Sequence, residues 1–455
     1  MSSRVSRKKK VLLVLGLLAV PLVACGWIAF RDEPPPADAY LRSVRRRSVK
    51  QEDNGFRLVR LTDEEVWHHE DEPMPEWYSP TIDTKIAEEF VERNAAVIEK
   101  IDRCLTLPDF QVELPETSSS PRPYLSGWSQ VTDVLALRAR LHLDSRRVPE
   151  AFEDAMRLTR FGRRIRSSQG DLYVYVLGTN LETLGLQVLV YTAIRGTMAP
   201  DGLRRGIRLL GEERSPSLWL ADALKTEYVA ITKAFEQMAS GELVERDLHR
   251  GWNKWRLGWP FFKPNQAARY LAEGMTPLIS SADIPAYERT LDLESRGAGD
   301  DNPTGSLFAG IKFMAEYFLV ALRGSLTHTD VNSFQLGATR TLLALLLARA
   351  ETGSLPASLE ALVPRYLTAV PLDPFSGEPL HYSSSERIIY SVGIDGEDGG
   401  SAQEDPLQAF RDKEEPTLRF SPEAWDLEAM EKSRQERERE ELKRQVQAGG
   451  AVWKE

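Results

Sequence analysis

Twenty consecutive residues without a charged side chain, Val11 to Phe30, follow a basic N-terminus that carries two arginines and three lysines and no acid. At about 1.5 Å per residue a helix of this length spans roughly 30 Å, the thickness of the hydrocarbon core of a bilayer. Basic flanks of such helices stay in the cytoplasm. The sequence therefore predicts a cytoplasmic tail (1–10) and a transmembrane signal anchor (11–30). As a single-pass cell-membrane protein, it would have the bulk of its chain extracytoplasmic.

A lipoprotein signal is the alternative interpretation of the same stretch. The tetrapeptide that ends at Cys25 is similar to a lipobox, in which case Cys25 would be lipidated and acyl chains would replace the helix. Residues 26–30 continue the apolar run past this cysteine, which favours the spanning helix. Both interpretations place the chain from about Arg31 onward outside the cytoplasm.

Composition excludes several classes of protein. The 455 residues leave room for more than one domain, and the net charge of −10, with no basic stripe after the N-terminus, argues against a nucleic-acid partner. Cys25 and Cys104 are the only cysteines, so neither a disulfide framework nor a cysteine-based zinc site is expected. Cys104 is predicted to be a small buried hydrophobic residue.

The fold class predicted for the body is mainly α, as an irregular helical bundle or a loose stack of helical hairpins. Residues 31–83, rich in proline and acidic side chains, are predicted as a stalk and irregular lead-in, and residues 84–330 as the helical domain. Helical patterns occur at 84–105, 128–143, 148–165, 172–194, 201–210, 218–238, 266–278, 284–293 and 307–322. The apolar stretch 172–194 carries Asn180 and Glu182, which predicts a buried central helix rather than a second membrane span.

The pattern changes near Gln335, where a small α+β module is predicted over residues 331–400. An amphipathic helix at 338–351 ends at Gly353, a short helix follows at 358–363, and two strands are expected at 380–383 and 388–391. Residues 401–455 are predicted to be a charged tail that ends in a solvated helix.

Three motifs in this module resemble those of the type II secretion major pseudopilin, over about residues 335–400. The matching positions are Gly353, Pro356 and Leu359; Asp373, Pro374, Gly377, Pro379 and Tyr382; and Ser391, Gly393, Asp395, Gly396, Gly399 and Gly400. The resemblance implies a compact soluble domain linked to a secretion apparatus. In that family the membrane helix is continuous with the long helix, whereas here the predicted anchor lies far upstream. The whole chain resembles exported bacterial helical proteins with such a tail.

The resemblance also implies a calcium ion, because pseudopilins of this type bind calcium in the C-terminal loop. Asp395, Glu397 and Asp398, together with Asp405, would supply carboxylate ligands on a glycine-rich backbone. A solvated acidic turn is the alternative.

One further segment is predicted to be an interaction patch, because its aromatic side chains alternate with basic ones. It contains Trp252, Trp255, Trp259, Phe261 and Phe262. Such rings suit a membrane interface or a protein partner, and the alternative is a loop that fills the core of the bundle.

No sequence motif of a catalytic or cofactor-binding site is present: there is no nucleophile elbow, phosphate-binding loop or dinucleotide fingerprint. Glu182 and Glu227 could form the paired carboxylates of a hydrolase, or each could be neutralised by an arginine or tyrosine. The leading hypothesis is a non-enzymatic, membrane-tethered helical scaffold that binds a protein. The alternative is an envelope hydrolase with buried carboxylates.

Overall fold

A computed structural model describes residues 31–61, 64–69, 73–115, 121–211, 217–240, 262–289, 309–398 and 403–452. The predicted anchor, with Cys25, lies outside these residues. Across the described ranges, no helix combines the length and the hydrophobicity that crossing a bilayer requires. The described chain is mainly helical and has a small three-stranded sheet, so this part of the predicted fold class is confirmed.

Residues 31–83 are irregular, as predicted, with short 3-10 turns at Gln51–Asp53 (η1) and Gly55–Leu58 (η2). They do not form a free stalk. Several of their apolar side chains are buried against the helices: Leu41, Phe56, Val59, Leu61, Val66 and Trp77. The indole of Trp128 also donates a hydrogen bond to the carbonyl of Val59 at 2.6 Å. The stalk prediction is therefore wrong, because these apolar side chains attach the segment to the body.

Two helices, α2 (Thr84–Arg93) and α3 (Ala95–Thr106), lie where one helical pattern was predicted. The Asp83 carboxylate caps α2 by accepting from two backbone N–H groups of its first turn. Asn94 separates the helices: its side chain is buried and donates to the carbonyls of Phe90 and Trp67. The predicted burial of Cys104, on α3, is confirmed.

The next three helices are α4 (Tyr124–Asp144), α5 (Val148–Arg166) and α6 (Leu172–Arg195). Helices α4 and α5 confirm the helical patterns predicted at 128–143 and 148–165. Helices α5 and α6 approach so closely that a Cβ atom at Gly162 or Gly178 would lie 2.2 Å from a backbone nitrogen of the partner helix. Glycine at these positions lets the two backbones meet.

Helices α7 (Pro200–Gly211), α8 (Ser217–Ser240) and α9 (Pro264–Ser281) follow near their predicted positions. The helix predicted at 284–293 is wrong over its described part. Only a 3-10 turn, η3 (Ala286–Glu288), is present in residues 284–289, where Pro285 has a ψ of 149°, outside the helical region.

Helix α10 (Ala309–Thr352) is 44 residues long and contains the described part of the helix predicted at 307–322 and all of the helix predicted at 338–351. At about 1.5 Å per residue it is roughly 66 Å long. It runs without a break across residue 330, where a domain boundary was predicted. The helical body and the C-terminal module therefore share one helix.

The C-terminal module contains η4 (Leu359–Leu362) and strands β1 (His381–Ser383), β2 (Ile388–Tyr390) and β3 (Thr417–Arg419). The strands form an antiparallel sheet in the order β1-β2-β3. The first two strands confirm the prediction, whereas β3 lies in the predicted tail.

The segments that carry the pseudopilin-like motifs contact one another. The buried carboxylate of Asp373 accepts from the hydroxyl of Ser391 at 2.6 Å and from the backbone N–H of Val392 at 3.1 Å. The Tyr382 hydroxyl donates to the carbonyl of Pro356 at 3.0 Å. These hydrogen bonds hold the three motif segments together. The relationship to the pseudopilin family stays a prediction.

The predicted tail is wrong for residues 403–430, which are folded. Helix α11 (Pro406–Ala409) and the residues around it bury Leu407, Phe410 and Trp425 in the main core. Helix α12 (Leu427–Val452) then leaves the body, and its described side chains beyond Met430 are half-buried or exposed. The apolar residues within the charged sequence explain the difference, because they need a partner surface.

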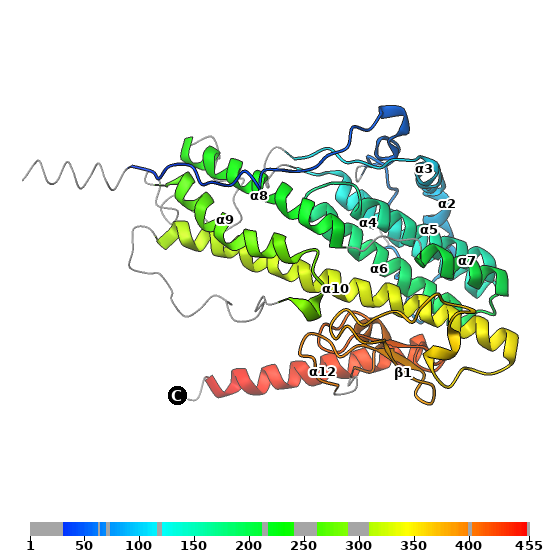
Figure 1. Cartoon of the computed structure of the whole chain (residues 1–455). Coiled ribbons are helices and arrows are strands. Elements are labelled where there is room, and N and C mark those ends of the chain that lie inside the picture. The colour runs from blue at the N-terminus through cyan, green and yellow to red at the C-terminus, as the bar shows by residue number, and fades with distance from the viewer. Residues whose placement is uncertain are drawn as a thin grey trace, which may run out of the picture.

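Figure 1 shows α10 between two layers, with α4 to α9 on one side and the sheet with α12 on the other. The main hydrophobic core runs from Phe56 through α4 to α6 and α10 to Met430. A second core joins α8, α9 and the first half of α10. The helical body and the C-terminal module thus belong to one packed structure.

Candidate functional site

A pocket of about 440 Å³ lies between α4, α6, α8 and α10. Its floor is one stripe of α6 at helical spacing, made by Leu172, Tyr173, Val176, Leu177 and Asn180. Leu125, Ser126 and Ser129 of α4 and Leu322 of α10 form its walls. The lining is mostly apolar, and Glu227 of α8 is the only carboxylate among the described residues that line it.

Glu227 is buried in the wall of this pocket, with 3% of its surface exposed. Its Oε2 atom has no hydrogen-bond partner among the described residues. Burial raises the pKa of Glu227 to about 7, and the negative charge of Asp171 adds to the rise; Arg122 and the backbone N–H of Leu172 oppose it. The carboxyl group therefore changes its charge near neutral pH.

The nearby cation, Arg122, is already paired with a different acid. Its Nε donates to Oδ2 of Asp171 at 2.6 Å, and both side chains are buried. Asp171 also caps α6, since its Oδ1 accepts from the backbone N–H of Val174 at 3.0 Å. The guanidinium carbon lies 5.0 Å from the ring centroid of Tyr173. Arg122 therefore neutralises Asp171, and no ion pair with Glu227 is found among the described residues.

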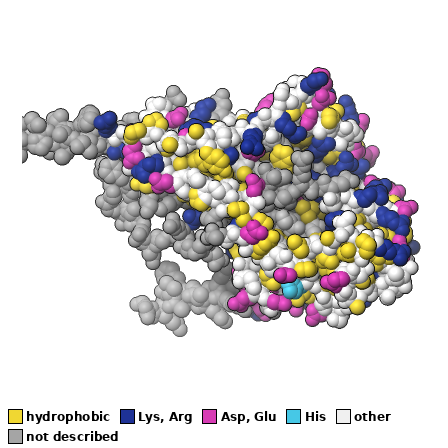
Figure 2. Space-filling view, viewed as in Figure 1, with side chains coloured by type: hydrophobic (Ala, Val, Ile, Leu, Met, Phe, Trp, Pro, Cys, Tyr) yellow, Lys and Arg dark blue, Asp and Glu magenta, His cyan; other side chains and the backbone are white. Residues whose placement is uncertain are grey.

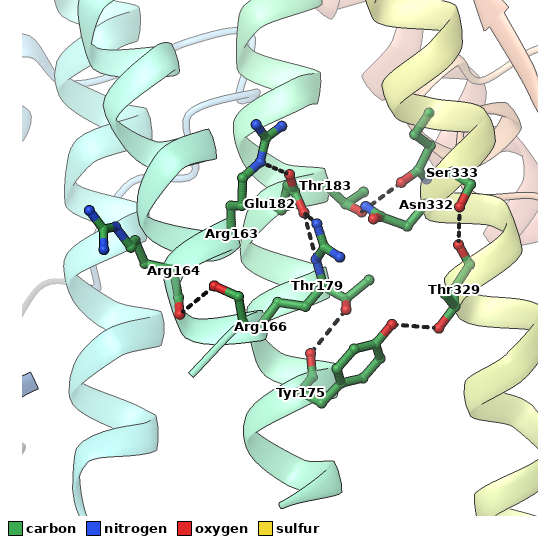
Figure 3. Close-up of polar contacts among 12 residues, drawn as sticks. Arg163, Arg164, Arg166, Tyr175, Thr179, Glu182, Thr183, Thr329, Asn332 and Ser333 are labelled. Atoms are coloured by element: carbon green, nitrogen blue, oxygen red, sulfur yellow. Dashed lines mark hydrogen bonds and ion pairs between the residues drawn. The ribbon is translucent and has the colours of Figure 1, made fainter. Parts of the chain in front are cut away.

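The other predicted carboxylate, Glu182, is held between two arginines of α5 (Figure 3). Nε of Arg163 donates to its Oε1 at 2.9 Å, and Nε of Arg166 donates to its Oε2 at 2.9 Å. The side chains of Glu182 and Arg166 are fully buried. This is the arginine-neutralised alternative, and it gives Glu182 a structural position between α5 and α6.

The structure does not bring Glu182 and Glu227 together. Glu227 lies beside the backbone of Leu172 at the start of α6. Glu182 is ten residues further along the same helix, about 15 Å at 1.5 Å per residue. Paired carboxylates in glycoside hydrolases are about 5 to 9.5 Å apart. These two glutamates therefore do not form a catalytic pair of that kind.

Polar side chains of α6 connect it to α10 and to the C-terminal segment. The hydroxyl groups of Tyr175 and Thr329 are 2.8 Å apart (Figure 3), and the Thr183 hydroxyl donates to Gln335 at 2.6 Å. The Gln335 amide donates to the carbonyl of Phe410 at 2.8 Å. The polar side chains of α6 thus form hydrogen bonds with α10, which is linked in turn to the C-terminal segment. The predicted burial of this helix is confirmed.

The acidic turn does not form a metal site among the described residues. Asp395, Glu397 and Asp398 are exposed, and Oδ1 of Asp395 accepts from the backbone N–H of Glu397. No group of three metal-ligating side chains is present in the described ranges, which exclude 399–402. Asp405 caps α11 and pairs with Arg434 at 2.8 Å, so it is already committed. Calcium binding stays a prediction.

Most of the predicted aromatic patch lies outside the described residues, namely Trp252, Trp255, Trp259 and Phe261. Phe262 is described and buried, with its ring centroid 5.8 Å from that of Phe235 in an edge-to-face contact. For Phe262 the structure supports the core-filling alternative.

Sequence reasoning selected Glu227 by residue type but missed the pocket and the pair of Arg122 and Asp171. The sequence does contain a signal for the role of Asp171: an aspartate directly before an apolar helical segment is a typical N-cap. The distant pairing with Arg122 had no sequence signal.

Comparison with known protein families, curated proteins and solved structures finds no match to this chain.

Proposed function

We propose that this protein is a non-enzymatic, membrane-tethered extracytoplasmic scaffold that binds a protein partner. In this proposal the predicted anchor holds the helical body in one orientation, because the chain is fastened to the body directly after the anchor. The observation that carries the proposal is the set of contacts between residues 32–33 and the start of α9.

Asp32 supplies the first of these contacts, two residues after the predicted anchor. Its carboxylate accepts from the backbone N–H of Asn265 at 2.9 Å and of Gln266 at 3.3 Å, in the first turn of α9. A carboxylate at a helix N-terminus satisfies free N–H groups and interacts favourably with the helix dipole.

Glu33 supplies the second contact. Its carboxylate accepts from Nε and Nη2 of Arg269 at 2.7 and 3.2 Å, and its carbonyl accepts from the Asn265 side chain at 2.9 Å. The Arg269 guanidinium lowers the pKa of Glu33 through this hydrogen bond. Only Arg31 separates the predicted membrane helix from these contacts, so a long flexible stalk is not available.

In this proposal the start of α9 lies nearest the membrane and α7 lies at the opposite end of the helical body (Figure 1). The C-terminal module lies along α10, which connects the two ends. We propose that the distal end and the module present the partner-binding surface, with the pseudopilin-like unit as a docking piece for a secretion apparatus. Figure 2 shows positively and negatively charged side chains at many places on the described face, and in this proposal they would form polar contacts with the partner.

The envelope-hydrolase alternative has less support. Glu182 is neutralised by two arginines and is distant from Glu227 along α6, so a mechanism with both carboxylates has no basis in this geometry. A hydrolase mechanism would have to depend on the one carboxyl group of Glu227, whose pKa burial raises to about 7.

Two variants test the tether. Deletion of residues 11–30 should release the protein from membranes, whereas Cys25→Ser should not. If Cys25→Ser releases the protein, the anchor is a lipid on Cys25 and not a spanning helix. If the deletion variant stays in the membrane fraction, residues 11–30 are not the anchor.

Energy transfer to an acceptor at the lipid surface tests the orientation. A donor would be attached at Glu273→Cys on α9, or at Asp201→Cys at the start of α7, where the native side chains are 59% and 96% exposed. Cys104 should not be labelled, because burial raises the pKa of its thiol to about 12.

Transfer should be stronger from Glu273→Cys, and the double variant Asp32→Ala/Glu33→Ala should reduce the difference between the two sites. Equal transfer from both sites in the otherwise unchanged chain would contradict a fixed orientation. Crosslinking in the native envelope from the same two positions tests the scaffold, with a recurrent protein partner expected only at the distal site.

A further inference from the structure

We propose that the pocket between α4, α6, α8 and α10 binds a small organic ammonium ion with an apolar body, and that Glu227 is its counter-ion. This site is independent of the scaffold role proposed above. The ligand class follows from the size of the pocket, from its lining and from the carboxylate oxygen of Glu227 that has no hydrogen-bond partner among the described residues.

The volume of about 440 Å³ lies within the range of about 300 to 1,000 Å³ that small-molecule sites occupy. Its floor exposes the apolar side chains of Val176 and Leu177, which are only half-buried. An apolar group placed over this stripe would complete the burial that the neighbouring helices leave unfinished. The body of the ligand is therefore a hydrocarbon chain or ring.

Glu227 determines the charge of the ligand. Its Oε2 atom is buried at the pocket wall without a hydrogen-bond partner among the described residues, which is costly for a polar group. No Lys, Arg or His is among the described residues that line this pocket. Arg122 is committed to Asp171 at 2.6 Å. An ammonium group would donate a hydrogen bond to Oε2 of Glu227 and place a positive charge beside it.

The electrostatics agree with this assignment. Burial raises the pKa of Glu227 to about 7, so at neutral pH the carboxyl group is divided between its neutral and its ionised form. A carboxylate ligand would meet the negative charge of Glu227, and among the described residues that line the pocket there is no Lys, Arg or His to pair with it. An ammonium ligand favours the ionised form of Glu227 instead.

Tyr173 lies at the mouth of the pocket, where it is 54% exposed. Its aromatic face already carries the Arg122 guanidinium at 5.0 Å from the ring centroid. Asn180, at the other end of the stripe, has its Oδ1 3.1 Å from Nε2 of His328. The polar groups at the two ends are thus engaged, and Glu227 is the group left for the ligand.

Three probes of matched shape test the proposal: phenylbutylamine, phenylbutanol and phenylbutanoate. Each is titrated by calorimetry into the full-length protein in nanodiscs at neutral pH, with empty nanodiscs as the blank. The amine should bind more tightly than the alcohol, and the acid should bind most weakly.

The variant Glu227→Gln should lower the affinity for the amine by about 10- to 100-fold, the usual contribution of a charged hydrogen bond, and leave the alcohol unchanged. Glu236→Gln is the matched control, because Glu236 is exposed on the same helix. Val176→Trp fills the pocket and should abolish binding of both the amine and the alcohol.

The proposal is overturned if the amine does not bind, if the alcohol or the acid binds as tightly as the amine, or if Glu227→Gln keeps the amine affinity. Binding that survives Val176→Trp would place the amine elsewhere and also overturns it. Near-ultraviolet circular dichroism of each variant confirms that the fold is retained.

Discussion

At the scale of single residues, two buried glutamates on helices differ in whether their carboxylates have hydrogen-bond partners. Glu182 receives hydrogen bonds from Arg163 and Arg166, whereas one oxygen of Glu227 has no partner among the described residues. Burial of a charge is tolerated when partners compensate it and shifts the pKa when they do not. Glu182 therefore belongs to the framework, and Glu227 remains available for a ligand.

Removing the Glu182 carboxylate should be severely destabilising. Glu182→Ala leaves Arg163 and the fully buried Arg166 without their acid, for which we expect a loss of about 3–5 kcal/mol in the free energy of unfolding. Urea denaturation measures this loss. Glu153→Ala is the control, since its pair with Arg205 is half-exposed and should contribute less than about 1 kcal/mol. A loss of that small size for Glu182→Ala would show that the buried pair is not structural.

Glu227 should make the stability depend on pH in a direction opposite to that of an ion-paired acid. Its pKa is about 7 in the folded protein and about 4.5 when unfolded. Between these values the folded protein retains a proton that the unfolded chain releases, so the free energy of unfolding falls as pH rises. The loss should reach about 3 kcal/mol above pH 7.

The comparison with Glu227→Gln isolates this contribution, because other titrating groups are common to both proteins. The stability of the native protein relative to the glutamine variant should fall from about pH 4.5 to about pH 7. A difference that does not change with pH would contradict the raised pKa.

At the scale of secondary-structure elements, the closest packing in the body is that of α5 against α6. Glycines at the crossing allow backbone contact, and a Cβ atom at Gly185 would also lie 2.5 Å from the backbone nitrogen of Thr159. Such contact lets the arginines of α5 reach Glu182 on α6. Ala151 and Ala155 of α5 are buried as well.

Gly178→Ala should therefore destabilise the protein although alanine favours helices. The added methyl group would meet the backbone of Arg166 at 2.2 Å, and we expect a loss of about 2 kcal/mol or more from overpacking. Gly324→Ala in α10 is the matched control: nothing lies within 4 Å of its Cβ position, so a gain of about 0.5–1 kcal/mol is expected. Thermal denaturation of the two variants should give shifts of opposite sign, and equal shifts would contradict the close crossing.

At the scale of the whole molecule, the C-terminal segment completes the main core. Strand β3 pairs with β2, and Trp425 packs with its ring centroid 6.0 Å from that of Tyr191 on α6. Asp405 connects α11 to α12 through Arg434. The helical body and the α+β module should consequently unfold together.

Truncation tests this cooperativity. A chain that ends at residue 402 loses β3 and the buried side chains of Phe410 and Trp425, and it should be strongly destabilised and sensitive to proteolysis. A chain that ends after Glu438 keeps these residues together with Arg434 and should retain most of its stability. If both truncated chains melt like the full-length protein, residues 403–430 do not support the core.

The sequence by itself determined the type and approximate position of most helices and of two strands, because local periodicity and caps carry this information. It also identified 172–194 as a buried helix, since polar side chains inside an apolar helix need partners. The separate helical patterns at 128–143 and 148–165 likewise correspond to α4 and α5.

Only the tertiary structure decided which distant side chains meet. It merged two predicted helices into α10 and folded residues 403–430 onto the core. It also assigned arginine partners to Glu182 and Asp171, whereas Oε2 of Glu227 has none among the described residues. These outcomes depend on packing between segments far apart in the chain, for which periodicity gives no signal. For the same reason the pocket beside Glu227 is a property of four helices together and of none alone.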